Sequence, residues 1–204
     1  MLVSSTIIDN INTMTKSGLA SLAFFYFDFR EDEKRNLHGL LSSVLVQLCH
    51  QSDTYSQILS RFYSEHKGGS QHPSDDELAQ CLKDILRVPG QATVYLIIDG
   101  LDECSNTSAM PSPREKVLKF LKDLMDSQLP NLRICVTSRP EIDIEATLKP
   151  LAFHSISLHD EDGQMEDIDN YIKHVVNMDQ NIRRWKAADK EQVIDVLIEK
   201  SDGM

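Results

Sequence analysis

The chain has 204 residues, a mass of 23.2 kDa, a formal net charge of −11 and a pI of about 5.0. The negative charge argues against non-specific binding to nucleic acid or anionic membranes, because both need positive charge on the protein. The longest mostly apolar run, LASLAFFYF (19–27), is too short to cross a bilayer, and the opening MLVSSTIIDN lacks the basic flank of a signal peptide. We therefore expect neither nucleic acid nor membrane as a partner.

The cysteines are scattered along the chain and form no C-x-x-C pair (Cys49, Cys81, Cys104 and Cys135). Scattered thiols without a secretion signal are typical of a reducing compartment, so we expect a cytoplasmic protein. No two Cys or His residues have the spacing of zinc ligands on a shared turn, and zinc is not expected.

The first half of the chain combines helical patterns with one strand-like run. Apolar residues recur at helical spacing in several segments, and a continuous aromatic-rich run is typical of a buried strand. Gly18 stands where a first helix would end, and Ser74 with Glu77 forms a capping box. These patterns predict a helix over 2–15, a strand over 20–29, and helices around 37–48, 54–64 and 75–86.

The second half repeats the alternation of strands and helices. Ser112, Pro113 and Glu115 supply a cap, a proline at the first helical position and an acid three residues after the cap. The patterns predict strands over 93–98, 132–137 and 153–158, and helices from 113 to about 125, near 141–148 and from about 165 onwards. Strands separated by helices imply right-handed crossovers, so we predict an α/β fold with a mostly parallel sheet and helices on both faces.

An acidic box directly follows the strand over 93–98, in the segment VYLIIDGLDE (94–103). In parallel sheets, ligands bind beyond the carboxyl ends of the strands, and Mg²⁺ prefers carboxylate oxygens together with water and phosphate. We therefore predict Asp99 as the metal-side carboxylate and Asp102 or Glu103 as the acid that activates a water. The alternative is an acidic turn that only caps the next element or faces solvent.

Arg139 follows the next predicted strand, in Thr137-Ser138-Arg139-Pro140. If the two strands are neighbours, its guanidinium can reach the same crevice and stabilise charge on a terminal phosphate. The alternative is a surface ion pair with a nearby acid.

The segment VYLIIDGLDE resembles the Walker B segment of NACHT domains, the signal-transduction NTPases (STAND) of the P-loop class. RICVTSRP is similar to their following strand with its sensor arginine, and LAFFYFDFREDEKRNLHGLLSSVLVQLC to the strand and helix between the two Walker motifs. The likeness is greatest to NACHT domains of large fungal proteins with ankyrin or WD40 repeats, also described as nephrocystin-type N-terminal domains. It covers roughly residues 1–160.

The resemblance implies a P-loop NTPase-like core over 1–160 and the start of a helical lid region over 161–204. It further implies that ATP or GTP binds with Mg²⁺ and that hydrolysis serves as a conformational timer. Asp99 then has the metal role, Asp102 and Glu103 the catalytic acidic positions, and Arg139 the phosphate-sensor position. The implied partners are the nucleotide, proteins bound through flanking effector and repeat domains, and further copies of the chain.

The phosphate-binding motif G-x-x-x-x-G-K-[ST] does not occur in the chain, because none of its eight glycines precedes a lysine. In the family this motif lies immediately before a helix like that over 2–15. We therefore expect a fragment that lacks the first strand and the phosphate loop and binds nucleotide weakly or not at all. A degenerate NTPase that serves as an interaction module is the second hypothesis. An unrelated α/β domain with an acidic metal pocket, such as a phospho-receiver, is the third.

Overall fold

The structure is a computed structural model, and it describes residues 2–66, 72–107, 110–157, 162–179, 182 and 184–201. The chain divides into two compact units, Met1–Ala152 and Phe153–Met204. The elements of the first unit are α1 (Leu2–Lys16), β1 (Ala20–Tyr26), η1 (Asp32–Lys34), α2 (Leu37–Cys49), α3 (Asp53–Glu65), α4 (Asp75–Leu86), β2 (Thr93–Asp99), η3 (Leu101–Glu103), α5 (Pro113–Asp126), β3 (Leu132–Val136) and α6 (Ile142–Leu148).

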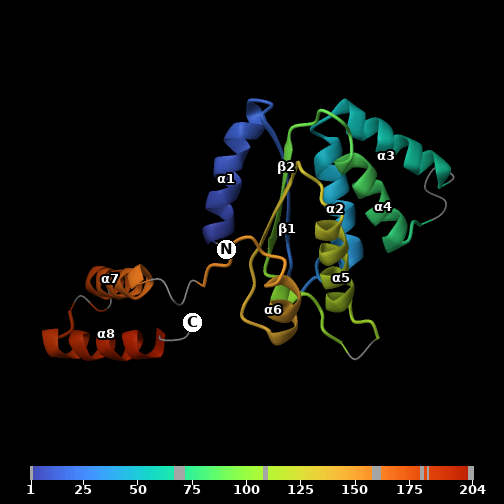
Figure 1. Ribbon diagram of the computed structural model, residues 1–204. Coiled ribbons are helices and arrows are strands. Elements are labelled where there is room, and N and C mark those ends of the chain that lie inside the picture. The colour runs from blue at the N-terminus through green and yellow to red at the C-terminus, as the bar shows by residue number, and fades with distance from the viewer. Residues whose placement is uncertain are drawn as a thin grey trace. The chain divides into compact units, whose positions relative to one another are not determined.

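The described strands form one parallel sheet in the order β1-β2-β3, with β2 in the centre (Figure 1). Ala20 pairs with Thr93 at the start of β1, and Val94 pairs with Leu132 at the start of β3. All three strands therefore end at the same edge of the sheet. This confirms the predicted α/β class and the parallel sheet.

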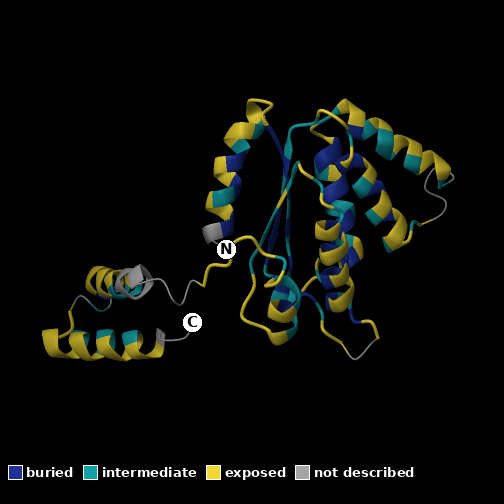
Figure 2. Cartoon of the chain, viewed as in Figure 1, coloured by how far each residue is buried: buried dark blue, intermediate teal, exposed yellow. Residues whose placement is uncertain are grey.

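Helices cover both faces of the sheet, as predicted. Successive side chains of a strand point to opposite faces. On one face Ile97 of β2 and Leu22 of β1 pack against Ile8 and Ile11 of α1. The opposite face carries the larger core, to which β2 contributes Val94, Leu96 and Ile98 and to which α2, α4 and α5 contribute their apolar stripes (Figure 2).

The helix ends follow the capping residues that the sequence provides. Ser74 and Ser112 each accept from the backbone N–H three residues on, and Glu77 and Glu115 bond back to the cap backbone, so both predicted capping boxes form. Proline at the first position of α5 costs no hydrogen bond, because that N–H has no partner within a helix.

The predicted strand over 153–158 is wrong for 153–157, and residue 158 lies outside the described part of the chain. The side chains of Phe153 and Ile156 are 94% and 73% exposed. A strand is stable only beside a hydrogen-bonding neighbour, and among the described residues the sheet ends at β3. The apolar pattern of these residues therefore does not by itself produce a strand.

The second unit contains α7 (Asp162–Met178) and α8 (Ala187–Ser201), which confirms the helical pattern predicted from about 165. The two helices pack against each other, and Val176 of α7 is buried. Among the described residues, no helix combines the length and the apolar character that crossing a membrane requires.

The outer edge of β1 is closed by two glutamine side chains, Gln47 of α2 and Gln51 of the turn that follows α2. The Gln47 amide accepts from Phe24 N at 3.0 Å and donates to Phe24 O at 2.7 Å. The Gln51 amide likewise accepts from Leu22 N at 2.9 Å and donates to Leu22 O at 2.6 Å. Each side-chain amide thus makes the two hydrogen bonds that one residue of a neighbouring strand would make. The outer edge of β1 is therefore closed to pairing at Leu22 and Phe24.

We expect Gln47→Leu and Gln51→Leu each to lower the free energy of unfolding by about 1–2 kcal/mol, because each leaves a partly buried backbone donor and acceptor without a partner. The double variant should also self-associate through the opened edge. Urea denaturation and light scattering measure the two effects. Gln57→Leu, at an exposed position of α3, is the control; an equal effect there would contradict the assigned role.

Candidate functional site

Asp99 ends β2 on the face that packs against α1. It follows Tyr95 and Ile97 at intervals of two, and its residue is only 9% exposed. Thr137 Oγ1, just beyond β3, donates to Asp99 Oδ1 at 2.6 Å. The hydroxyl of Ser4, in the first turn of α1, donates to the same oxygen. Asp99 therefore joins the end of β2, the end of β3 and the start of α1.

Gly100 turns the chain sharply after Asp99. Its φ of 68° and ψ of 41° lie in the left-handed region, which favours glycine. Its N–H donates to Thr137 Oγ1 at 3.1 Å, and the N–H of the next residue, Leu101, donates to Thr137 O at 3.0 Å. Leu101 is fully buried and anchors the short turn η3, which carries the other two acids.

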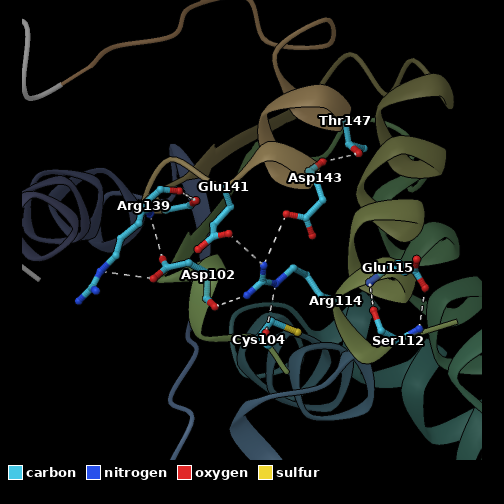
Figure 3. Close-up of polar contacts among 10 residues, drawn as sticks. Asp102, Cys104, Ser112, Arg114, Glu115, Arg139, Glu141, Asp143 and Thr147 are labelled. Carbon is cyan, nitrogen blue, oxygen red and sulfur yellow. Dashed lines mark hydrogen bonds and ion pairs between the residues drawn. The ribbon is translucent and has the colours of Figure 1, made fainter. Parts of the chain in front are cut away.

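Asp102 and Arg139 lie together, as expected if their strands are neighbours, and the contact between their side chains is the ion pair expected from the sequence as the alternative for Arg139. The backbone N–H of Arg139 donates to Asp102 Oδ1 at 3.0 Å, and its Nε lies 3.6 Å from Oδ2 (Figure 3). The Arg139 side chain is 84% exposed, whereas that of Asp102 is 13% exposed. The arginine is thus held at its backbone while its guanidinium remains accessible to solvent.

Glu103 turns towards the segment that follows β1. Its Oε2 accepts from Phe29 N at 3.4 Å. The three acids therefore have different partners: Asp99 contacts Ser4 and Thr137, Asp102 contacts Arg139, and Glu103 contacts Phe29. They share an edge of the sheet, but in the described part of the chain no three His, Cys, Asp or Glu side chains are grouped to hold a metal.

A magnesium ion would fit this edge only together with oxygen ligands from a bound molecule. Mg²⁺ commonly takes one or two carboxylates and completes its shell with water and substrate phosphates. Asp99 offers one buried carboxylate with hydroxyl groups beside it. This donor set suits a metal that arrives with a phosphate, and it does not suit a permanent metal site made of protein ligands alone.

The cysteines near the site are not activated for nucleophilic attack. Burial raises the pKa of the Cys104 thiol to about 12. Burial and the charge of Asp99 raise the pKa of Cys135 as well. Because the thiolate is the reactive form, neither side chain supplies a nucleophile at neutral pH.

A hollow of about 300 Å³ lies at the opposite edge of the sheet, next to the amino-terminal ends of β1 and β2. Its lining includes Thr15, Gly18, Tyr55 and Gln91, and none of its lining residues is charged. It therefore offers no charge to neutralise a phosphate and no carboxylate to hold a metal ion, so the carboxyl edge remains the candidate site.

Sequence reasoning missed Ser4 and Arg114 and gave Thr137 no role. Arg114 was detectable, because it lies three and four residues before Val117 and Leu118 and thus on the buried stripe of α5. A charged residue on an apolar stripe indicates a buried ion pair or hydrogen-bond network. The contact of Ser4 with Asp99 had no such signal, because these residues are 95 positions apart.

The fold and the edge define a class: an α/β domain with a parallel, P-loop-like sheet and an acidic turn beyond its central strand. Residues 2–139 match the family model described as "Nephrocystin 3, N-terminal". The match spans more than half of the chain, so the chain belongs to this family, a NACHT-related domain. No curated protein matches the chain.

Thr137 should be more important for stability than its position in a loop suggests. We expect Thr137→Val to lower the free energy of unfolding by about 1.5–3 kcal/mol, because it removes a hydrogen bond to a buried carboxylate. Thr137→Ser keeps the hydroxyl and should lose less than about 1 kcal/mol. Urea denaturation measures both.

Thr13→Val is the control, since the exposed Thr13 hydroxyl bonds only to carbonyls of its own helix. If the serine and valine variants of Thr137 were equally destabilised, the hydroxyl would not be the cause.

Proposed function

We propose that the chain is part of a NACHT-type signalling NTPase that binds ATP or GTP with Mg²⁺ and uses hydrolysis as a conformational switch. The observation that carries this proposal is the hydrogen bond from Ser4 to Asp99. It brings the first turn of α1 to the carboxyl edge of the sheet, beside the acidic turn. The amino end of a helix favours phosphate, because its N–H groups and dipole are directed at the ligand.

Asp99 would hold the magnesium ion, which neutralises phosphate charge when bound. Its burial supports this role, because a buried carboxylate binds a cation more strongly than an exposed one. Asp102 and Glu103 would orient the attacking water and accept its proton. Arg139, fixed at its backbone but exposed at its guanidinium, would move onto the terminal phosphate and stabilise its charge.

In this proposal the phosphate loop belongs to the parent protein and comes before Leu2 in its sequence. The 204 residues contain no G-x-x-x-x-G-K-[ST], so they lack the lysine and the backbone cradle that anchor a triphosphate. We therefore expect these residues alone to bind nucleotide weakly or not at all. The same absence favours a second candidate function, an interaction module without catalysis that acts through its flanking domains.

The deciding experiment begins with the 5′ end of the native transcript. If the proposal is right, the codons before Met1 encode an apolar strand and a glycine-rich loop that ends in Gly-Lys-Ser or Gly-Lys-Thr. The extended protein should then bind Mg-ATP or Mg-GTP in a calorimetric titration, whereas residues 1–204 should not. Asp99→Asn should weaken binding at least about tenfold in the presence of Mg²⁺ and much less in EDTA.

Asp126→Asn, at an exposed position near the end of α5, is the matched control and should leave the affinity unchanged. Translation that truly starts at Met1, together with no nucleotide binding by the native protein, would decide for the interaction module. A micromolar dissociation constant for residues 1–204 would contradict the need for the upstream loop.

A further inference from the structure

Arg114 is a buried cation next to the acidic turn. It is the second residue of α5, and its side chain is only 8% exposed. A guanidinium keeps its charge in proteins, and its burial is unfavourable unless its N–H groups are bonded. The groups that it binds are therefore held firmly in place.

Two of these groups are carbonyls of the turn that follows β2. Arg114 Nη2 donates to Asp102 O at 2.5 Å, and Nε donates to Cys104 O at 3.2 Å (Figure 3). The backbone N–H of Arg114 also donates to Ser105 O at 3.0 Å. The turn that carries Asp102 and Glu103 is thus attached to the start of α5 at three carbonyls.

The other side of the guanidinium faces the segment that follows β3. Nη1 lies 3.5 Å from Asp143 Oδ1 and 3.9 Å from Glu141 Oε2. Glu141 immediately precedes α6 and comes two residues after Arg139. Arg114 therefore contacts both segments that leave the carboxyl edge beside Asp102 and Arg139.

These contacts close a ring of interactions. Asp102 is held at its main-chain oxygen by Arg114, and its carboxylate accepts from the backbone N–H of Arg139. We propose that Arg114 is a positioning residue that keeps the acidic turn and the Arg139 segment in one fixed relation. This deepens the proposed function, on which it rests, because it names the residue that would align Asp102 with Arg139 for the terminal phosphate.

The competing explanation is that Arg114 only neutralises Glu141 and Asp143. The distances favour the carbonyls, at 2.5 Å and 3.2 Å, over the carboxylates, at 3.5 Å and 3.9 Å. The two carboxylates are also partly exposed, and exposed ion pairs contribute little. A planar guanidinium can serve both carbonyls at once, whereas a lysine ammonium would reach only one of them well.

The test uses the 204-residue chain without nucleotide and measures amide hydrogen exchange by NMR at a fixed pH. Arg139 is exposed and its N–H donates to the Asp102 carboxylate, so this bond should slow exchange at Arg139, and Asp102→Ala should abolish the slowing. Arg114→Lys and Arg114→Met should each speed exchange at Arg139 severalfold, while exchange of the β2 amides changes much less. A purely stabilising role would speed exchange at β2 as much as at Arg139.

Arg133→Lys is the matched control, since Arg133 is exposed and also donates to two carbonyls, of Pro130 and Leu132. It should leave the exchange rate at Arg139 unchanged. If Arg114→Met fails to fold, Arg114→Lys decides alone. An unchanged exchange rate at Arg139 in Arg114→Lys would overturn the proposal, as would unprotected exchange at Arg139 in the wild type or an equal increase in Glu141→Gln/Asp143→Asn. Because no nucleotide is present, failure of the chain to bind ATP or GTP leaves this result unaffected.

Discussion

The parallel pairing of β2 with β1 and β3 is the constraint on which the carboxyl edge depends. Parallel strands all end at the same edge, so the segments after Tyr26, Asp99 and Val136 leave the sheet side by side. The ladder continues beyond the strands themselves: Phe27 N donates to Asp99 O, and Thr137 N donates to Ile98 O. Contacts among residues distant in sequence, such as Glu103 with Phe29 and Asp102 with Arg139, follow from this geometry.

Charge is distributed unevenly over this edge. Asp99 is buried and, as described above, hydroxyl groups solvate it in place of a cation. Hydroxyl donors lower the cost of burying a carboxylate but leave its charge uncompensated. The cations of the site lie elsewhere: Arg114 is committed to the acidic turn, and the Arg139 guanidinium is directed to solvent. Among the described residues, no arginine forms an ion pair with Asp99, and this supports the proposal that a divalent ion binds there.

The fold was largely predictable, because its signals are local. Helical periodicity, the caps at Ser74 and Ser112 and the apolar run before Asp99 depend on residues close in sequence. The position of Arg139 beside Asp102 was predictable from the rule that parallel strands end together. The roles of Ser4 and Thr137 were not, because a hydroxyl has no periodicity and its partner is set only by packing. The false strand over 153–157 shows the same limit, since a strand depends on a neighbour that its own residues do not specify.

The two edges of the sheet differ in whether a further strand could pair there. The peptide groups of Leu22 and Phe24 point away from β2. The side-chain amides of Gln51 and Gln47 form hydrogen bonds with them. At the other edge the ladder alternation directs the peptide groups of Ile134 and Val136 away from β2, and in the described part of the chain no strand pairs with them. A further strand can therefore join beside β3 but not beside β1. If such a strand ran parallel to β3, it would end beside Thr137, whose hydroxyl bonds to Asp99, at the edge that Ser4 of α1 also reaches.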